Sequence, residues 1–204
     1  MSRISTPLLS SLLVAVGLVA VPALHAQSAQ RFSIQGSGLF VGMSGDAYEG
    51  MDAGPGAELQ IRYTPSVWSF GLGYQYSTHG VDVDGFDDDV TLSGAFFEPR
   101  RTFDVGSATY APYASARLAV LKEAIDFDAG GESYSASATG TQINIGGGVL
   151  FRISPRVNFD LGATFGIINF GDVEVTVPGM GTATVGEGGS GQNFVLRAGI
   201  AIGL

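Results

Sequence analysis

The last eleven residues of the chain alternate strictly between two kinds of side chain. The apolar series is Phe194, Leu196, Ala198, Ile200, Ile202 and Leu204, and the series between them is Val195, Arg197, Gly199, Ala201 and Gly203. Successive side chains of a β-strand point to opposite faces. The segment therefore predicts a strand with one apolar wall and one wall of mostly small or charged residues.

The N-terminus predicts a secretory signal peptide. A basic residue, Arg3, precedes an apolar stretch over 8–21, and small residues (Ala23, Ala26) then offer cleavage sites. A membrane-anchor helix is the alternative, but the stretch is shorter than the roughly 20 residues that span a bilayer. We expect cleavage after Ala26, which makes 1–26 the signal peptide and 27–204 a single β-barrel domain.

Alternating segments recur along the whole of that domain. They fall at about 31–43, 55–64, 67–78, 89–99, 108–121, 140–153, 156–169 and 192–204. In the four clearest segments one face is entirely apolar, and Val195 is the only large hydrophobic residue on the other face. A water-soluble sandwich or lipocalin-like barrel also alternates, but its outer face would carry many Lys and Glu side chains. Here only 14% of residues are charged, so we expect the apolar face to contact lipid.

The spacing of the segments predicts an all-β, eight-stranded, antiparallel up-and-down transmembrane barrel. Short turns, such as 64–66 and 154–156, alternate with longer connections at about 44–54, 78–89, 122–139 and 170–191, which is the rhythm of short periplasmic turns and long external loops. The last two long connections contain further strand-like hairpins, about 130–131 and 178–181. The pair Phe96-Phe97 before Pro99 suggests a β-bulge that shifts the register of the fourth strand.

The long connections hold most of the negative charge. The chain has a formal net charge of −9, which disfavours nucleic acid as a partner because its phosphates require clustered Lys and Arg. The acidic residues make a solvated external rim, or alternatively bind divalent cations, since Asp oxygens suit Ca²⁺ and Mg²⁺. The weak metal candidates are Asp82, Asp84, Asp87, Asp88 and Asp89.

Charged residues also occur on the inward face of the predicted strands. By parity they are Glu58, Arg62, Arg117, Arg152, Asp160 and Arg197, with Glu98 and Arg100 joining them after the bulge. A charge enclosed in a narrow lumen must be paired or hydrated. We expect a structural salt-bridge network that fills the interior. A gated ion path is the less favoured alternative, because eight strands leave a lumen that side chains only just fill.

Enzymatic chemistry has few candidate residues in this chain. His79 is the one histidine left after signal cleavage, and Ser77 and Asp82 lie close to it in sequence. A nucleophilic triad needs a base within hydrogen-bond reach and an orienting group. We expect His79 to be an exposed loop residue, and we expect no catalytic site, no cofactor and no enzyme activity.

The segment 31–204 resembles the small outer-membrane β-barrel family of the OmpA-transmembrane, OmpX and Ail type. The likeness rests on the signal, the eight strands, the turn-and-loop rhythm, Ala111-Pro112-Tyr113-Ala114 and the terminal strand, although such chains usually end in Phe and this one ends in Leu204. The resemblance implies a monomer in the bacterial outer membrane, in contact with lipids and lipopolysaccharide.

Three functional hypotheses follow from this resemblance. The first is a structural or adhesive surface barrel that meets an external protein or divalent cation through its acidic loops. The others are a narrow pore or small-ligand barrel, and a lipid-modifying enzyme. The terminal strand 194–204 is the expected contact with the outer-membrane assembly machinery.

Overall fold

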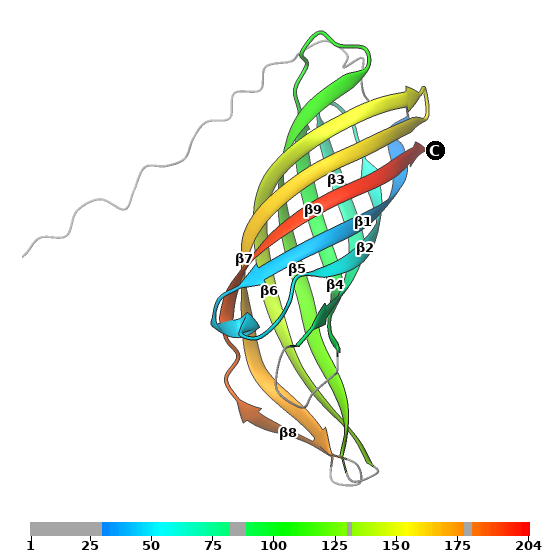
Figure 1. The fold of residues 1–204 in the computed structure, drawn as a ribbon. Helices are drawn as coiled ribbons and strands as arrows, with labels where there is room; N and C mark the ends of the chain where they lie inside the picture. The colour runs from blue at the N-terminus through cyan, green and yellow to red at the C-terminus, as the bar shows by residue number, and fades with distance from the viewer. Residues whose placement is uncertain (1–29, 82–88, 130–131, 178–180) are drawn as a thin grey trace, which may run out of the picture.

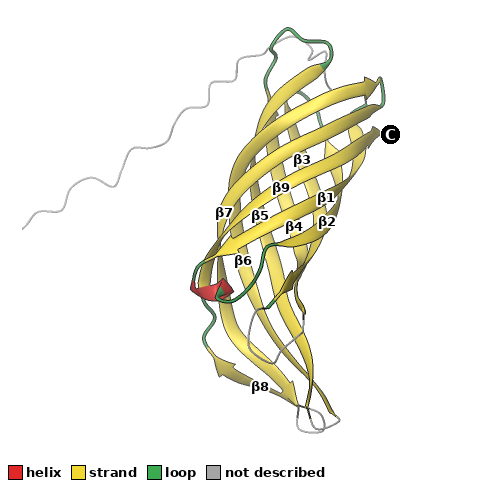
Figure 2. Cartoon of the chain, viewed as in Figure 1, coloured by secondary structure: helices red, strands yellow, loops and turns green. Residues whose placement is uncertain are grey.

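Almost all of the described chain is β-strand, arranged as a tall tilted barrel (Figures 1 and 2). The computed structural model describes residues 30–81, 89–129, 132–177 and 181–204; the expected signal peptide, 1–26, lies outside these ranges. The elements are β1 (Phe32–Ser44), the 3-10 helix η1 (Asp46–Tyr48), β2 (Gly54–Tyr63), β3 (Trp68–Gly80), β4 (Asp89–Thr102), β5 (Tyr110–Ala129), β6 (Glu132–Ser154), β7 (Val157–Val177), β8 (Gly181–Gly186) and β9 (Ser190–Gly203).

The sheet closes on itself through antiparallel pairings. Neighbouring strands follow the order β6-β5-β4-β3-β2-β1-β9-β7-β8, and an additional pairing between β6 and β7 completes the circle. β8 pairs only with β7 among the described strands and stands outside the ring. The wall is therefore an eight-stranded antiparallel barrel made of β1–β7 and β9, which confirms the predicted fold.

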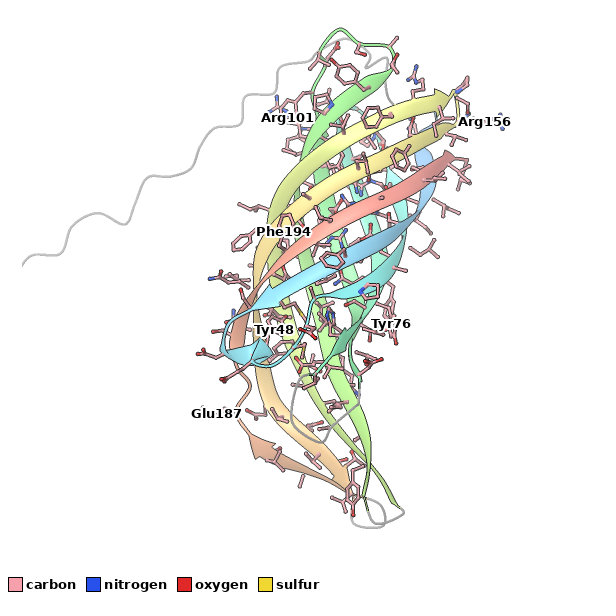
Figure 3. The ribbon with its side chains drawn as sticks, viewed as in Figure 1. Tyr48, Tyr76, Arg101, Arg156, Glu187 and Phe194 are labelled. Atoms are coloured by element: carbon pink, nitrogen blue, oxygen red, sulfur yellow. The ribbon has the colours of Figure 1, made fainter. Side chains whose placement is uncertain are left out.

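The outer wall is apolar around the barrel. Leu59, Leu72 and Ile145 are each more than 60% exposed in the isolated chain, and Figure 3 shows Tyr76 and Phe194 projecting from the outside of the wall. Water-soluble proteins rarely expose so large an apolar surface, whereas a barrel that spans a membrane presents an apolar band to the lipid. None of the described residues forms a helix long and apolar enough to cross a bilayer.

The two ends of the barrel differ in how the strands are joined. At the short-turn end, drawn uppermost in Figure 1, the connections are 64–67, 103–109 and 155–156, and the C-terminus lies there. At the opposite, long-loop end, β5 and β6 stay paired out to Ala129 and Glu132. β7 and β8 form a second hairpin there, so much of the predicted loops 122–139 and 170–191 is strand.

The expected bulge in β4 is wrong. Phe97 pairs with Leu118 and Arg100 pairs with Ser115, so three steps along β4 match three steps along β5 and no residue is inserted. Phe96 is 2% exposed and Phe97 is 43% exposed. One of two adjacent apolar side chains simply faces the interior.

Candidate functional site

A charged network fills the short-turn half of the lumen, and Glu98 is its centre. This carboxylate is fully buried and contacts four guanidinium groups. Arg117 Nη2 and Arg197 Nη1 lie 2.6 and 2.9 Å from its Oε2, Arg62 Nη1 lies 3.2 Å from its Oε1, and Arg100 Nε also donates to Oε1. Such charge-assisted bonds offset much of the cost of removing the ions from water.

Two further carboxylates complete the network. Glu58 lies 2.7 Å from Arg117 Nη2 and 3.4 Å from Arg197 Nη1. Asp160 lies 2.8 Å from Arg100 Nη1, and it also accepts hydrogen bonds from Tyr113 Oη at 2.7 Å and Gln35 Nε2 at 2.7 Å. The ionic side chains thus belong to one connected set and not to separate pairs.

Glycines in the same rungs make room for these long side chains. Gly71 pairs with Arg62 on one side and with Glu98 on the other, so Arg62 reaches Glu98 across a position without a side chain. A Cβ at Gly71 would lie 2.6 Å from Arg62 Nη1. Small residues on the inward face are therefore the counterpart of the large ions.

The structure brings together most of the lumen residues singled out from parity. Seven of them share the network: Glu58, Arg62, Glu98, Arg100, Arg117, Asp160 and Arg197. Arg152 lies apart from this group. It is half-buried near the short-turn end of β6, where it pairs in register with Asn158 on β7.

The long-loop half of the lumen contains a large apolar cluster beside the buried polar residues Ser77, His79 and Gln142, contrary to the prediction that salt bridges fill the interior. Its buried cluster consists of Tyr48, Leu92, Phe96, Ala119, Leu121, Ala138, Ile168 and Phe170. The Tyr48 and Phe170 rings meet edge to face with centroids 6.0 Å apart. Phe96 marks the boundary between the two halves, because the Arg117 guanidinium carbon lies 3.8 Å from its ring centroid.

The connection between β1 and β2 closes this end. η1 places Tyr48 inside the barrel mouth, where its side chain is 3% exposed, and Figure 3 shows it at that end. The ring rests on the backbone of Gly191 in β9, where an added Cβ would lie 2.5 Å from the ring atoms. We call residues 45–53 the cap.

His79 anchors the cap and is not an exposed loop residue, so that prediction is wrong. It is 1% exposed; Nδ1 lies 3.0 Å from the Asp52 carbonyl oxygen and Nε2 lies 2.9 Å from Ser77 Oγ. The backbone N–H of Asp52 also donates to the Gly80 carbonyl. The inward and outward alternation of β3 continues to its long-loop end at Gly80, two residues beyond the predicted strand 67–78.

Burial raises the pKa of two titratable groups at the cap, Glu123 and Tyr48. Glu123 lies one residue beyond Lys122, which is exposed on the outside of β5 and ends the apolar belt there. Burial raises the pKa of Glu123 to about 7. Burial, and then the charge of Glu123, raise the pKa of Tyr48 above its ordinary value.

A four-stranded sheet, made of the outer parts of β5, β6, β7 and β8, extends past the cap. Its register runs through Ala124↔Ser137, Ser137↔Glu174 and Glu174↔Thr184. We call it the protruding sheet, and its lower part, with β8 and Glu187, is visible in Figure 3. Exposed acidic side chains surround this end: Asp46, Glu49, Asp52, Asp89, Asp172, Glu174 and Glu187.

Four of the five metal-ligand candidates fall in a segment that the structure does not describe. Asp82, Asp84, Asp87 and Asp88 lie outside the described residues, and Asp89 is exposed at the start of β4. Among the residues that are described, no group of three His, Cys, Asp or Glu side chains is arranged to hold a metal ion.

A closed barrel with an apolar outer wall and a side-chain-filled interior defines the class of small membrane-spanning β-barrels. The model of the outer membrane protein beta-barrel domain family matches residues 11–200. The chain therefore belongs to that family. Membership of the family indicates that the protein is located in the bacterial outer membrane.

Solved structures of other outer-membrane proteins share this fold. Neisserial surface protein A is 18% identical, with a TM-score of 0.60 over 85% of this chain and 97% of that one. A major outer membrane protein from Thermus thermophilus is 12% identical, with a TM-score of 0.51 over 85% and 98%. Ail, the attachment invasion locus protein of Yersinia pestis, in complex with the heparin analogue sucrose octasulfate, is 18% identical, with a TM-score of 0.50 over 84% and 97%. A search of curated protein sequences finds no match.

Proposed function

We propose that this protein is a non-conducting surface barrel whose acidic protruding sheet interacts with partners outside the cell. The single observation that carries the proposal is the protruding sheet itself. It continues the barrel wall beyond the apolar belt and ends in β8, all six residues of which are exposed. A barrel that served only to span the membrane would not need this extension.

The charge and the edge of the sheet both suit an external protein. Asp172, Glu174 and Glu187 are exposed around β8, and the whole stretch 157–196 contains no Lys or Arg. β8 pairs only with β7 among the described strands, so its other edge is open to an added strand. Binding of a partner that carries basic, extended segments follows from both features.

The contents of the lumen favour a surface role over the pore alternative. The charged network occupies one half and the apolar cluster with its cap occupies the other. An ion crossing the barrel would have to displace Tyr48 and then pass four arginines. We therefore expect no steady single-channel currents from the purified protein in planar bilayers.

Whole-cell experiments test the surface role. Bacteria that express the protein should adhere to epithelial cells and to surfaces coated with a basic protein more strongly than bacteria that lack it. A variant with 172–187 replaced by a short Gly-Ser turn should lose this gain while it keeps a folded, heat-modifiable band on gels. Unchanged adhesion by this variant would contradict the proposal.

A charge-neutral variant provides the matched control. Asp172→Asn, Glu174→Gln and Glu187→Gln together keep β8 and its edge but remove the local negative charge. If charge attracts the partner, adhesion to the basic coating falls in this variant as well. If only the strand edge matters, adhesion persists in this variant and is lost with the hairpin.

A further inference from the structure

The charges enclosed in the barrel do not balance. Among the described residues, and leaving aside His79, the charged side chains no more than 5% exposed are four arginines and three carboxylates. The arginines are Arg62, Arg100, Arg117 and Arg197, and the carboxylates are Glu58, Glu98 and Asp160. Arginine stays protonated in proteins, so the network holds one positive charge in excess. An unbalanced buried charge is costly, and a counter-ion would relieve that cost.

A polar cavity lies beside the network at the short-turn end of the lumen. It has a volume of about 40 Å³ and is lined mainly by polar side chains, including Arg62, Arg100, Ser69, Gln35 and Asn158. A water molecule requires roughly 10–15 Å³ on this measure, so the cavity is large enough for a small ion and a few waters. It is too small for an organic substrate.

Two residues that line this cavity, Arg100 and Asn158, each have a polar side-chain atom without a hydrogen-bond partner among the described residues. Arg100 is 2% exposed and uses Nε on Glu98 and Nη1 on Asp160 and Gln35, but its Nη2 makes no hydrogen bond to any described residue. Asn158 is 5% exposed, and its Oδ1 has no partner among the described residues either. Rotation of this amide by 180° would present its NH₂ group instead. A guanidinium N–H and a neighbouring amide are suitable ligands for an anion.

We propose that this cavity binds one small monovalent anion, with the chemistry of chloride, held among Arg62, Arg100 and Asn158 and neutralising the excess positive charge of the lumen. The ion would be a structural counter-ion of the barrel. Its binding depends on the lumen alone and is independent of the surface role proposed above.

Anion-dependent stability of the wild-type protein is the first test. The protein is folded in detergent micelles and unfolded with urea in sodium chloride or in sodium gluconate at equal ionic strength, since gluconate is too large for the cavity. We expect greater stability in chloride, with the unfolding constant falling about tenfold for each tenfold rise in chloride once the site is near saturation. Equal stability in both salts would overturn the proposal.

Crystallography with bromide is a second and independent test. Bromide replaces chloride and scatters anomalously, so crystals soaked in sodium bromide should show one anomalous peak inside the cavity, between Arg62, Arg100 and Asn158. Density at that position without an anomalous signal would mean that water alone fills the cavity. That result would also overturn the proposal.

Matched Asn→Asp substitutions localise the effect. Asn158→Asp puts a permanent carboxylate into the cavity, so it should abolish the chloride dependence and stabilise the protein in gluconate. Asn144→Asp makes the same change at a buried position that donates to Asn193 Oδ1, at 2.9 Å, outside the residues that line the cavity. This control should retain the chloride dependence; a chloride response retained by Asn158→Asp and lost by Asn144→Asp would contradict the assigned position.

Discussion

The short-turn half and the long-loop half of the lumen are both lined by inward-facing positions of the same strands, yet one holds an ionic network and the other an apolar cluster. The short-turn half contains seven ionic side chains that share their contacts, with Glu98 touching four arginines. The long-loop half contains a cluster of eight buried apolar or aromatic residues, one of which, Tyr48, comes from the cap. Removing any one member of the ionic network leaves a buried charge without its partner, which is strongly destabilising. Removing side-chain volume from the apolar cluster lowers stability in proportion to the cavity left behind.

The largest expected effect comes from breaking the ionic half at its centre. Glu98→Gln leaves four buried guanidinium groups facing two carboxylates, so we expect a loss of about 3–5 kcal/mol in the free energy of unfolding. Urea titration of the protein in micelles measures this loss. Glu98→Gln combined with Arg62→Met removes one charge of each sign and should recover part of the stability. A shared network would be contradicted if the double variant lost more free energy of unfolding than the two single variants lose when their losses are added.

Removing volume from the apolar half should have a smaller effect. Leu121 is fully buried in the cluster, so Leu121→Ala should cost about 3 kcal/mol through lost burial and the cavity left behind. Leu118→Ala on the same strand is the control, because Leu118 is 53% exposed on the outer wall. In micelles that substitution should cost clearly less than Leu121→Ala. Equal losses would mean that the interior at this level is not closely packed.

A single added methyl group at Gly191 should disturb the packing of the cap residue Tyr48 against β9. Gly191→Ala places a Cβ 2.5 Å from the Tyr48 ring, and overpacking of this kind costs about 1–3 kcal/mol. Gly186→Ala, where a Cβ meets nothing within 4 Å, should change stability by less than about 0.5 kcal/mol. Faster tryptic cleavage after Lys122 in Gly191→Ala alone would show that the cap had loosened.

Acidification should stabilise the long-loop half slightly. The pKa of Glu123 is raised by burial to about 7 in the folded protein, above its ordinary value near 4.3. The folded state therefore binds this proton more tightly, so the penalty for a charged Glu123 is absent below about pH 4 and grows until about pH 7. The gain from pH 8 to pH 5 should be about 1 kcal/mol after allowance for solvent screening. Glu123→Gln should remove that increment, and Glu174→Gln, an exposed control, should retain it.

The outer wall could be predicted from the sequence because hydrocarbon imposes one rule on every outward position. Alternation with one apolar face, as around Leu72 and Phe194, predicted the clearest strands, the rhythm of short turns and long loops predicted the barrel, and the expected turn near 178–181 predicted the hairpin of β7 and β8. The interior obeys no such rule. Phe96, for example, lies against the Arg117 guanidinium and also belongs to the cluster that contains Tyr48, a residue far away in the sequence.

The same limit applies to the network and to His79. Parity assigned Arg62 and Arg197 to the lumen, but their shared contact with Glu98 depends on the stagger between strands, which period-two alternation does not encode. His79 was misassigned because the strand continues inward to Gly80 under the cap. A polar residue at the end of an alternating segment has the same local pattern whether it is capped or exposed.

The pairing of β1 with β9 has a consequence for how the molecule is assembled. Ser33 lies opposite Gly203, so this pairing joins two strands that are about as far apart in the sequence as any in the barrel. It can form only after the strands between them have been synthesised. Contacts so distant in sequence are slow to form because a long chain must be ordered before they are gained. Until β1 and β9 pair, the edges of both strands carry backbone N–H and C=O groups without hydrogen-bond partners.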